Sequence, residues 1–164
     1  MLLLVAQQCL SEKFADNLKR ELPRIPLASD IKAFAKAGKK LAELHLGYEE
    51  LEPYELNFVE APAVPLSYRI EDKMRLSKDK LRLTVNPSLT LTGIPPETFE
   101  YRLGNRSALD WVIDQYQVST DKRSGITSDP NRDDDPEYIV RLVGQVIRVS
   151  LETVKIVNAL PDYA

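Results

Sequence analysis

The chain has 164 residues, 43% of them hydrophobic and 29% charged, as in one soluble globular domain. No apolar run approaches the ~20 residues that a membrane-spanning helix needs, so we expect no membrane partner. A lone Cys9 excludes an internal disulfide, and the apolar start lacks the features of a secretory signal, which together predict a cytoplasmic protein. The net charge of −3 argues against tight DNA binding by this chain alone, because clustered Lys and Arg neutralise phosphates.

Helices are predicted for the N-terminal part. The first is expected from about Leu2 to Arg20, before Pro23, because proline disfavours helical geometry in the preceding residue. Ser29 is expected to cap a second helix, and Gly47 to end it in a left-handed turn. The apolar stripe of this second helix is predicted from its spacing to contain Ile31, Phe34, Leu41 and Leu44.

The middle of the chain changes its pattern twice. Prolines at 53, 62 and 65 predict an irregular crossing over residues 49–68. Over residues 74–91, apolar and polar residues alternate at a spacing of two, which is typical of half-buried strands. Turn residues at 77–80 and 86–88 divide this stretch, so a three-stranded antiparallel meander is predicted. Its outward face is expected to carry Arg75, Lys80, Arg82, Thr84, Thr90 and Thr92.

Helical patterns return towards the C-terminus. A short helix is expected to begin at Pro95–Pro96 and to end at Gly104, and Ser107 with Asp110 resembles a capping box that starts another. Residues 118–136 are predicted to form a long polar loop, which leads into a last helix opened by residues 135–136. The polar residues of that helix form one narrow stripe, so it is expected to be central to the core. The stripe contains Arg141, Gln145, Arg148, Glu152 and Lys155. The predicted fold class is α+β, a helical bundle packed with a small antiparallel three-stranded meander, in a single domain over residues 1–164.

Patterns typical of enzymes are missing from the sequence. His45 has no second His or Cys nearby, so a packing or surface role is expected for it. The acidic run 133–137 lacks the spaced ligands and glycine of a calcium loop and is interpreted as charge at a helix start. Asn86-Pro87 superficially resembles the Asn-Pro-Pro-aromatic signature of adenine methyltransferases. Ser-Leu follows instead of Pro and an aromatic residue, so the dipeptide is interpreted as a turn. We therefore expect no catalysis, no metal and no cofactor.

One polar segment, residues 116–126, carries side chains suited to DNA. Gln117 can read adenine and Arg123 can pair with guanine. The hydroxyls at Ser119, Thr120 and Ser124 can bind phosphate. Arg106 stands just before a predicted helix N-terminus, where backbone amides favour anions. Polar surface loops commonly have the same composition, so these residue types alone leave a plain surface loop as an alternative.

Several long strings resemble the C-terminal specificity region of Type ISP restriction–modification enzymes. They are NLKRELPRIP at 17–26, AGKKLAELH at 37–45, LTLTGIP at 89–95, YRLGNRSALDW at 101–111, YQVSTDKRSGI at 116–126 and YIVRL at 138–142. The resemblance therefore spans about residues 17–161. Members of that family join a nuclease, a helicase-like ATPase, a coupling region, an N6-adenine methyltransferase and a target-recognition domain in one polypeptide. This chain is similar to the last of these parts.

The resemblance implies a non-catalytic target-recognition module that positions duplex DNA for a linked adenine methyltransferase and nuclease–ATPase. Its expected partners are double-stranded DNA and the methyltransferase and ATPase regions of the same or a companion polypeptide. The residues assigned to DNA are Arg106, Gln117, Ser119, Thr120, Lys122, Arg123 and Ser124, with Lys80 and Arg82 on the sheet face. The alternative is an interaction module that docks on the methyltransferase region without direct DNA contact, which the acidic net charge favours.

Overall fold

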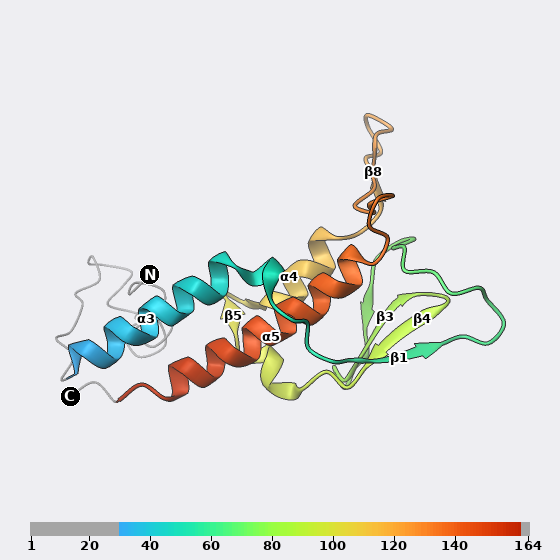
Figure 1. Cartoon of the computed structure of the whole chain (residues 1–164). Coiled ribbons are helices and arrows are strands. Elements are labelled where there is room, and N and C mark those ends of the chain that lie inside the picture. Colours follow the sequence, from blue (N-terminus) through green and yellow to red (C-terminus); the bar gives the residue numbers. More distant parts are fainter. Residues whose placement is uncertain (1–29, 162–164) are drawn as a thin grey trace. The chain divides into compact units, whose positions relative to one another are not determined.

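The computed structural model describes residues 30–161, which divide between two compact units (Figure 1). One unit contains residues 30–47 and 153–161, and the other contains residues 48–152. The helix expected at 2–20 and the expected cap Ser29 lie outside the described residues. That the whole chain acts as a single domain stays a prediction.

The elements follow one another along the chain as helices, 3-10 turns (η) and short strands. They are α3 (Ile31–Leu46), η1 (Tyr48–Glu50), β1 (Asn57–Glu60), β2 (Arg75–Leu76), β3 (Arg82–Asn86), β4 (Leu89–Thr92), η2 (Pro96–Phe99), β5 (Arg102–Leu103), β6 (Arg106–Ser107), α4 (Ala108–Gln115), β7 (Ser119–Thr120), β8 (Thr127–Ser128) and α5 (Tyr138–Asn158).

Helix α3 begins and ends differently from the prediction. Asp30 is its N-cap, and the Asp30 carboxylate accepts a hydrogen bond from the amide of Ala33 at 2.9 Å. Gly47 follows the last turn with a φ of −101°, so the expected left-handed turn is wrong. The amide of Gly47 instead donates to the carbonyl of Glu43, which closes the helix without a positive φ.

The buried face of α3 does not include every residue of the predicted apolar stripe. Phe34, Ala37 and Leu41 are buried, whereas Ile31 is 65% exposed although it was expected on the same stripe. His45 has a local packing role, as expected: its Nδ1 lies 2.6 Å from the carbonyl oxygen of Leu41, and its Nε2 lies 3.5 Å from the hydroxyl of Thr153.

An antiparallel sheet of four strands dominates the larger unit, in the order β1-β4-β3-β2. The three expected strands are present, but the prediction of three was incomplete, because β1 lies at the edge within the stretch expected to be irregular. All four β1 residues are exposed, so no alternation of burial marks the strand, and only its pairing with β4 reveals it. The α+β class is confirmed. The helical bundle stays a prediction, because α3 and α4 belong to different units.

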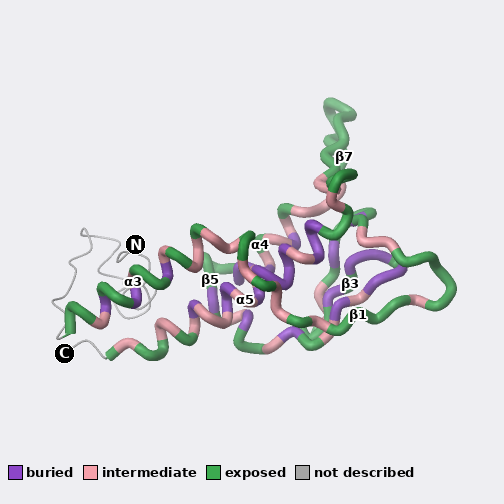
Figure 2. The backbone as a smooth tube through the Cα atoms, in the orientation of Figure 1, coloured by how far each residue is buried: buried purple, intermediate pink, exposed green. Residues whose placement is uncertain are grey.

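One face of this sheet is covered and the other is open. Leu83 and Leu91 point to the covered face and are fully buried, whereas their neighbours Arg82 and Thr84 are exposed. Lys80 belongs to the turn before β3 rather than to the open face, and has a φ of 61°. Helices α4 and α5 contribute Leu109, Ile113, Ile139, Val143 and Ile147 to the same core. Figure 2 shows buried stretches on both helices.

The N-terminal part of the polar stripe of α5 is covered by the main chain of residues 49–53, not by solvent. Gln145 is 3% exposed, and its Nε2 donates to the carbonyl oxygens of Glu49 and Leu51 at 2.7 and 3.1 Å. The guanidinium of Arg148 donates to carbonyls of the same crossing segment. Gly144 allows this approach, because a Cβ there would lie 2.8 Å from the Cβ of Pro53.

Two local predictions are confirmed and one is wrong. Ser107 and Asp110 form a reciprocal capping box at the start of α4. Asn86 makes the β3–β4 turn, where its Oδ1 accepts from the amides of the next two non-proline residues, Ser88 and Leu89. The helix expected to end at Gly104 is a single 3-10 turn that ends at Phe99, and Gly104 has a φ of 70° in the turn between β5 and β6.

Candidate nucleic-acid interface

The expected long loop contains a small hairpin. Strands β7 and β8 pair Ser119 with Ser128 and Thr120 with Thr127, and the two threonine hydroxyls lie 2.9 Å apart. Gly125, with a φ of 71°, allows the turn to close. Figure 1 shows the hairpin projecting from the rest of its unit, and Figure 2 shows it exposed. Segment 119–124 is therefore presented to solvent, as a DNA contact requires.

Asp121 organises the tip of this hairpin. Its Oδ1 accepts hydrogen bonds from the amides of Ser124 and Arg123 at 2.7 and 2.9 Å, and from the hydroxyl of Ser124. These bonds, those from Ser124 first, hold the pKa of Asp121 below its ordinary value. Lys122 and Arg123 are exposed at this tip, and neither forms an ion pair within the described part of the chain. The tip therefore presents two cations on an ordered turn.

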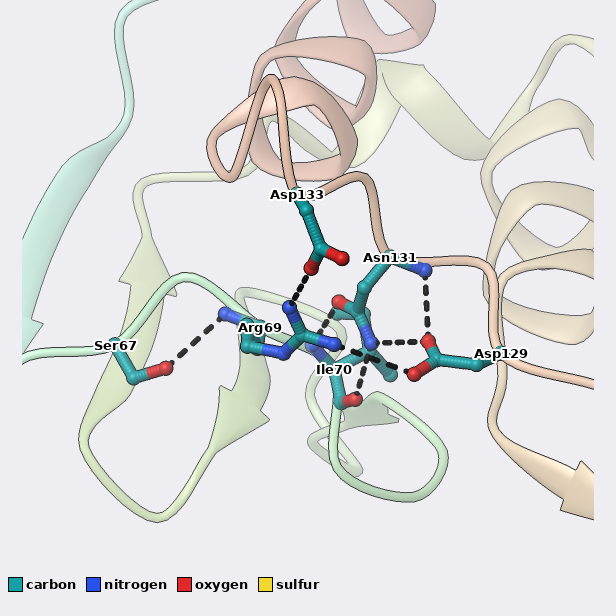
Figure 3. Close-up of polar contacts among 6 residues, drawn as sticks. All are labelled: Ser67, Arg69, Ile70, Asp129, Asn131 and Asp133. Atoms are coloured by element: carbon teal, nitrogen blue, oxygen red, sulfur yellow. Dashed lines mark hydrogen bonds and ion pairs between the residues drawn. The ribbon is translucent and has the colours of Figure 1, made fainter.

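Both ends of the hairpin are fastened to the same short segment, residues 69–72. At the first end, the amide of Val118 donates to the carbonyl of Asp72 at 2.9 Å. At the second, the side chain of Asn131 pairs with both backbone groups of Ile70: Oδ1 accepts from the amide at 2.7 Å and Nδ2 donates to the carbonyl at 2.8 Å (Figure 3). The hairpin is thus anchored at two points.

Arg69 completes the second anchor. Its guanidinium contacts the carboxylates of Asp133 at 2.7 Å and Asp129 at 3.3 Å (Figure 3). The acidic run was expected to carry charge at the start of α5, but no acidic residue lies in the first turn of that helix. Asp133 binds Arg69 and Asp135 binds Arg141, so the run supplies ion-pair partners instead.

Arg106 takes part in a cluster around Asp114. The Arg106 and Lys73 side chains contact different oxygens of the Asp114 carboxylate, and the hydrogen bond from Lys73 is the main cause that lowers the Asp114 pKa. The guanidinium of Arg106 also lies 5.6 Å from the centre of the Trp111 ring. Arg106 was expected to act at the amide end of α4, but it reaches to the last turn of that helix.

Three other predicted residues have local contacts. Gln117 is partly buried, and its Nε2 donates to the carbonyl of Asp114 at 2.9 Å. Lys80 lies with its Nζ 4.7 Å from the centre of the Phe99 ring. Arg82 is exposed on the open sheet face, 3.5 Å from the carboxylate of Asp79.

The structure thus gathers five of the nine predicted residues, Ser119 to Ser124, on one hairpin. Arg106 and Gln117 both contact Asp114, and Lys80 and Arg82 lie apart from the hairpin, around β3. Sequence reasoning missed the anchoring residues and the Asp114 cluster. Asn131 bonds locally to Asp129, which indicates a turn, but its main partner is 61 residues away.

Over residues 30–161, no group of three or more His, Cys, Asp or Glu residues is placed to hold a metal ion. No helix in that range is long and apolar enough to cross a membrane.

Comparison with known proteins identifies the family. The model of the Type ISP C-terminal specificity domain matches residues 4–142. The chain belongs to this family. The resemblance noted in the sequence is therefore confirmed, and the match extends over the hairpin, its anchors and the Asp114 cluster of this specificity domain. No curated protein matches the chain.

Three solved structures are similar to this specificity domain. The ATP-dependent Type ISP restriction-modification enzyme LlaBIII bound to DNA is 38% identical, with a TM-score of 0.82 over 93% of this chain. A nuclease-deletion mutant of the Type ISP enzyme LlaGI in complex with a DNA substrate mimic is 39% identical, with a TM-score of 0.80 over 93%. The DrdV–DNA complex, solved by cryo-electron microscopy, is 34% identical, with a TM-score of 0.75 over 92%. This chain spans 10%, 15% and 16% of those three chains.

Proposed function

We propose that this specificity domain recognises double-stranded DNA and that the β7–β8 hairpin is its main contact element. The observation that carries the proposal is the exposed hairpin tip, which holds Lys122 and Arg123 without ion-pair partners among residues 30–161. The three similar structures all contain DNA or a DNA mimic, which supports the same conclusion.

The shape of the hairpin suits this role. The DNA major groove admits a two-stranded β-ribbon, and β7–β8 is such a ribbon. Contacts to phosphates fix the position of a protein on the duplex, whereas contacts to base edges read its sequence. We assign phosphate contacts to Lys122 and Arg123, and base or backbone contacts to Ser119, Thr120 and Ser124.

The remaining predicted residues have supporting roles in the proposal. Gln117 donates one Nε2 hydrogen bond to the carbonyl of Asp114, which holds its side chain beside the start of the hairpin, and its amide oxygen is the group we assign to base contact. Lys80, in the turn before β3, and Arg82, on β3, extend the contact beyond the hairpin. Arg106 lies outside the hairpin, where it contacts Asp114.

The chemistry of restriction and modification belongs, in this proposal, to other regions of the same or a companion polypeptide. The chain covers at most 16% of the three similar structures, which leaves room in such proteins for a methyltransferase and a nuclease–ATPase. The specificity domain would position the duplex for them and catalyse nothing itself.

The test measures duplex binding by the 164-residue chain over a range of salt concentrations. Replacing Lys122 and Arg123 by Ala is expected to weaken binding about tenfold at low salt and to reduce the log–log salt slope by about 1.8, since each phosphate contact contributes about 0.9. The matched control replaces Lys32 and Lys36, two exposed lysines of α3, by Ala, which changes the net charge by the same amount. Parent-like binding by the Lys122/Arg123 variant would show that the hairpin tip is not the contact.

The alternative, an interaction module that docks on the methyltransferase region, is favoured by the net charge of −3. It predicts that the parent chain binds no duplex even at low salt.

A further inference from the structure

A shallow groove of about 600 Å³ borders the first end of the hairpin. The two are adjacent because Val118 pairs with Asp72, the residue before the groove residue Lys73. Three cationic side chains line it, Lys73, Arg75 and Arg106, together with the carboxylates of Asp110 and Asp114. Among the residues that line the groove, there are thus three cations and two carboxylates.

The two carboxylates of the groove, Asp110 and Asp114, make different contacts. Asp110 completes the capping box of α4, where its Oδ2 accepts from the amide and the hydroxyl of Ser107. Asp114 contacts Lys73 and Arg106, one cation on each oxygen. Arg75 pairs with Asp72 at 3.2 Å, but the two side chains are 77% and 71% exposed, and such surface pairs are weak.

The cations at Asp114 are accessible to a ligand. The side chains of Lys73 and Arg106 are 44% and 48% exposed, whereas that of Asp114 is 27% exposed. A carboxylate and a phosphodiester each carry one negative charge on paired oxygens, and both accept charge-assisted hydrogen bonds from Arg and Lys. A backbone phosphate can therefore replace the carboxylate at both cations.

We propose that this groove is a second phosphate-binding surface for the DNA backbone and that Asp114 is a built-in competitor for its cations. The inference rests on the proposed function, because it takes duplex DNA as the ligand. The Asp114 carboxylate keeps Lys73 and Arg106 ordered while DNA is absent, which reduces the side-chain freedom lost on binding. It also lowers the affinity, because the phosphate must displace it.

The principal test compares Asp114→Asn with the parent chain in binding a short duplex. Asparagine keeps the shape of the side chain and removes its charge, so D114N is expected to bind about three- to tenfold more tightly at low salt, because the phosphate no longer has to displace a carboxylate. The matched control is Glu43→Gln, which makes the same change of net charge in an exposed pair with Lys39 on α3. E43Q should bind like the parent.

Lys73→Gln and Arg106→Gln provide a test that does not need D114N to fold. Each is expected to weaken duplex binding about threefold or more, for one lost phosphate contact. Trp111, the single tryptophan of the chain, is 41% exposed beside Arg106 and gives a direct signal. Duplex binding should change its fluorescence in the parent, and R106Q should remove most of that change.

The outcomes separate this inference from the proposed function. If D114N matches E43Q and both Gln variants match the parent, while the Lys122/Arg123 variant binds weakly, the groove inference is overturned and the hairpin stands. If neither the parent nor D114N binds the duplex, both proposals are overturned. If D114N gains affinity for an acidic peptide but not for the duplex, the groove serves a protein and the DNA inference is wrong.

Discussion

Replacing Asn131 by Ala tests how the hairpin is fastened to its unit. The Asn131 side chain makes two hydrogen bonds with the backbone of Ile70, at 2.7 and 2.8 Å, and Ile70 is only 2% exposed. Alanine leaves that amide and that carbonyl without these partners. Each such bond contributes about 0.5–1.5 kcal/mol, so N131A is expected to lower the free energy of unfolding by about 2 kcal/mol. For a protein of this size, this loss lowers Tm by about 4–8 °C.

The assay is urea unfolding of parent and variant, followed by circular dichroism, with amide hydrogen exchange of Ile70 and Val118 as a local measurement. Exchange should become faster at Ile70, whose amide loses its acceptor, before the core is affected. Asn105→Ala is the matched control, because Asn105 is exposed in the β5–β6 turn and its side chain makes no hydrogen bond with the rest of residues 30–161. An N131A chain as stable as N105A, with unchanged exchange at Ile70, would refute the anchoring argument.

Two further predictions concern α5. Gly144→Ala is expected to destabilise the chain by about 1–3 kcal/mol, because the new Cβ would lie 2.8 Å from the Cβ of Pro53 and 3.1 Å from the carbonyl oxygen of Tyr54. The control is Gly38→Ala in α3, where a new Cβ would meet nothing within 4 Å. This control should stabilise the chain by about 0.5–1 kcal/mol. Equal unfolding free energies for these two variants would contradict the close approach at Gly144. The hydrogen bond from Arg141 lowers the pKa of Asp135 from its ordinary value of 3.8, so this pair stabilises the fold above that pH and the stabilisation is lost as the pH falls through the lowered pKa. Asp135→Asn should therefore lose less stability than the parent between pH 7 and pH 3, and equal losses in urea titrations at the two pH values would count against the pair.

Local signals in the sequence determined much of the fold. The capping box at Ser107 and Asp110, the turn at Asn86 and the alternation through β3 and β4 were all predicted, because each depends on residues only two to four positions apart. The family was also recognisable from the sequence, since long strings of residues carried the resemblance that the match over residues 4–142 confirms. The polar and basic residue types of the hairpin also led to the prediction of contact with DNA.

Only the tertiary structure decided how those residues are presented. Strand β1 has no burial pattern of its own and forms because β4, more than 25 residues further along the chain, offers a free edge. Val118 and Asn131 anchor the hairpin on residues 70–72, and Lys73 meets Arg106 at Asp114, across separations of up to 61 residues. Such partners are set by the packing of the sheet against α4 and α5. A sequence pattern reports which side chains can bind a charge, whereas the folded chain determines which charges are already neutralised.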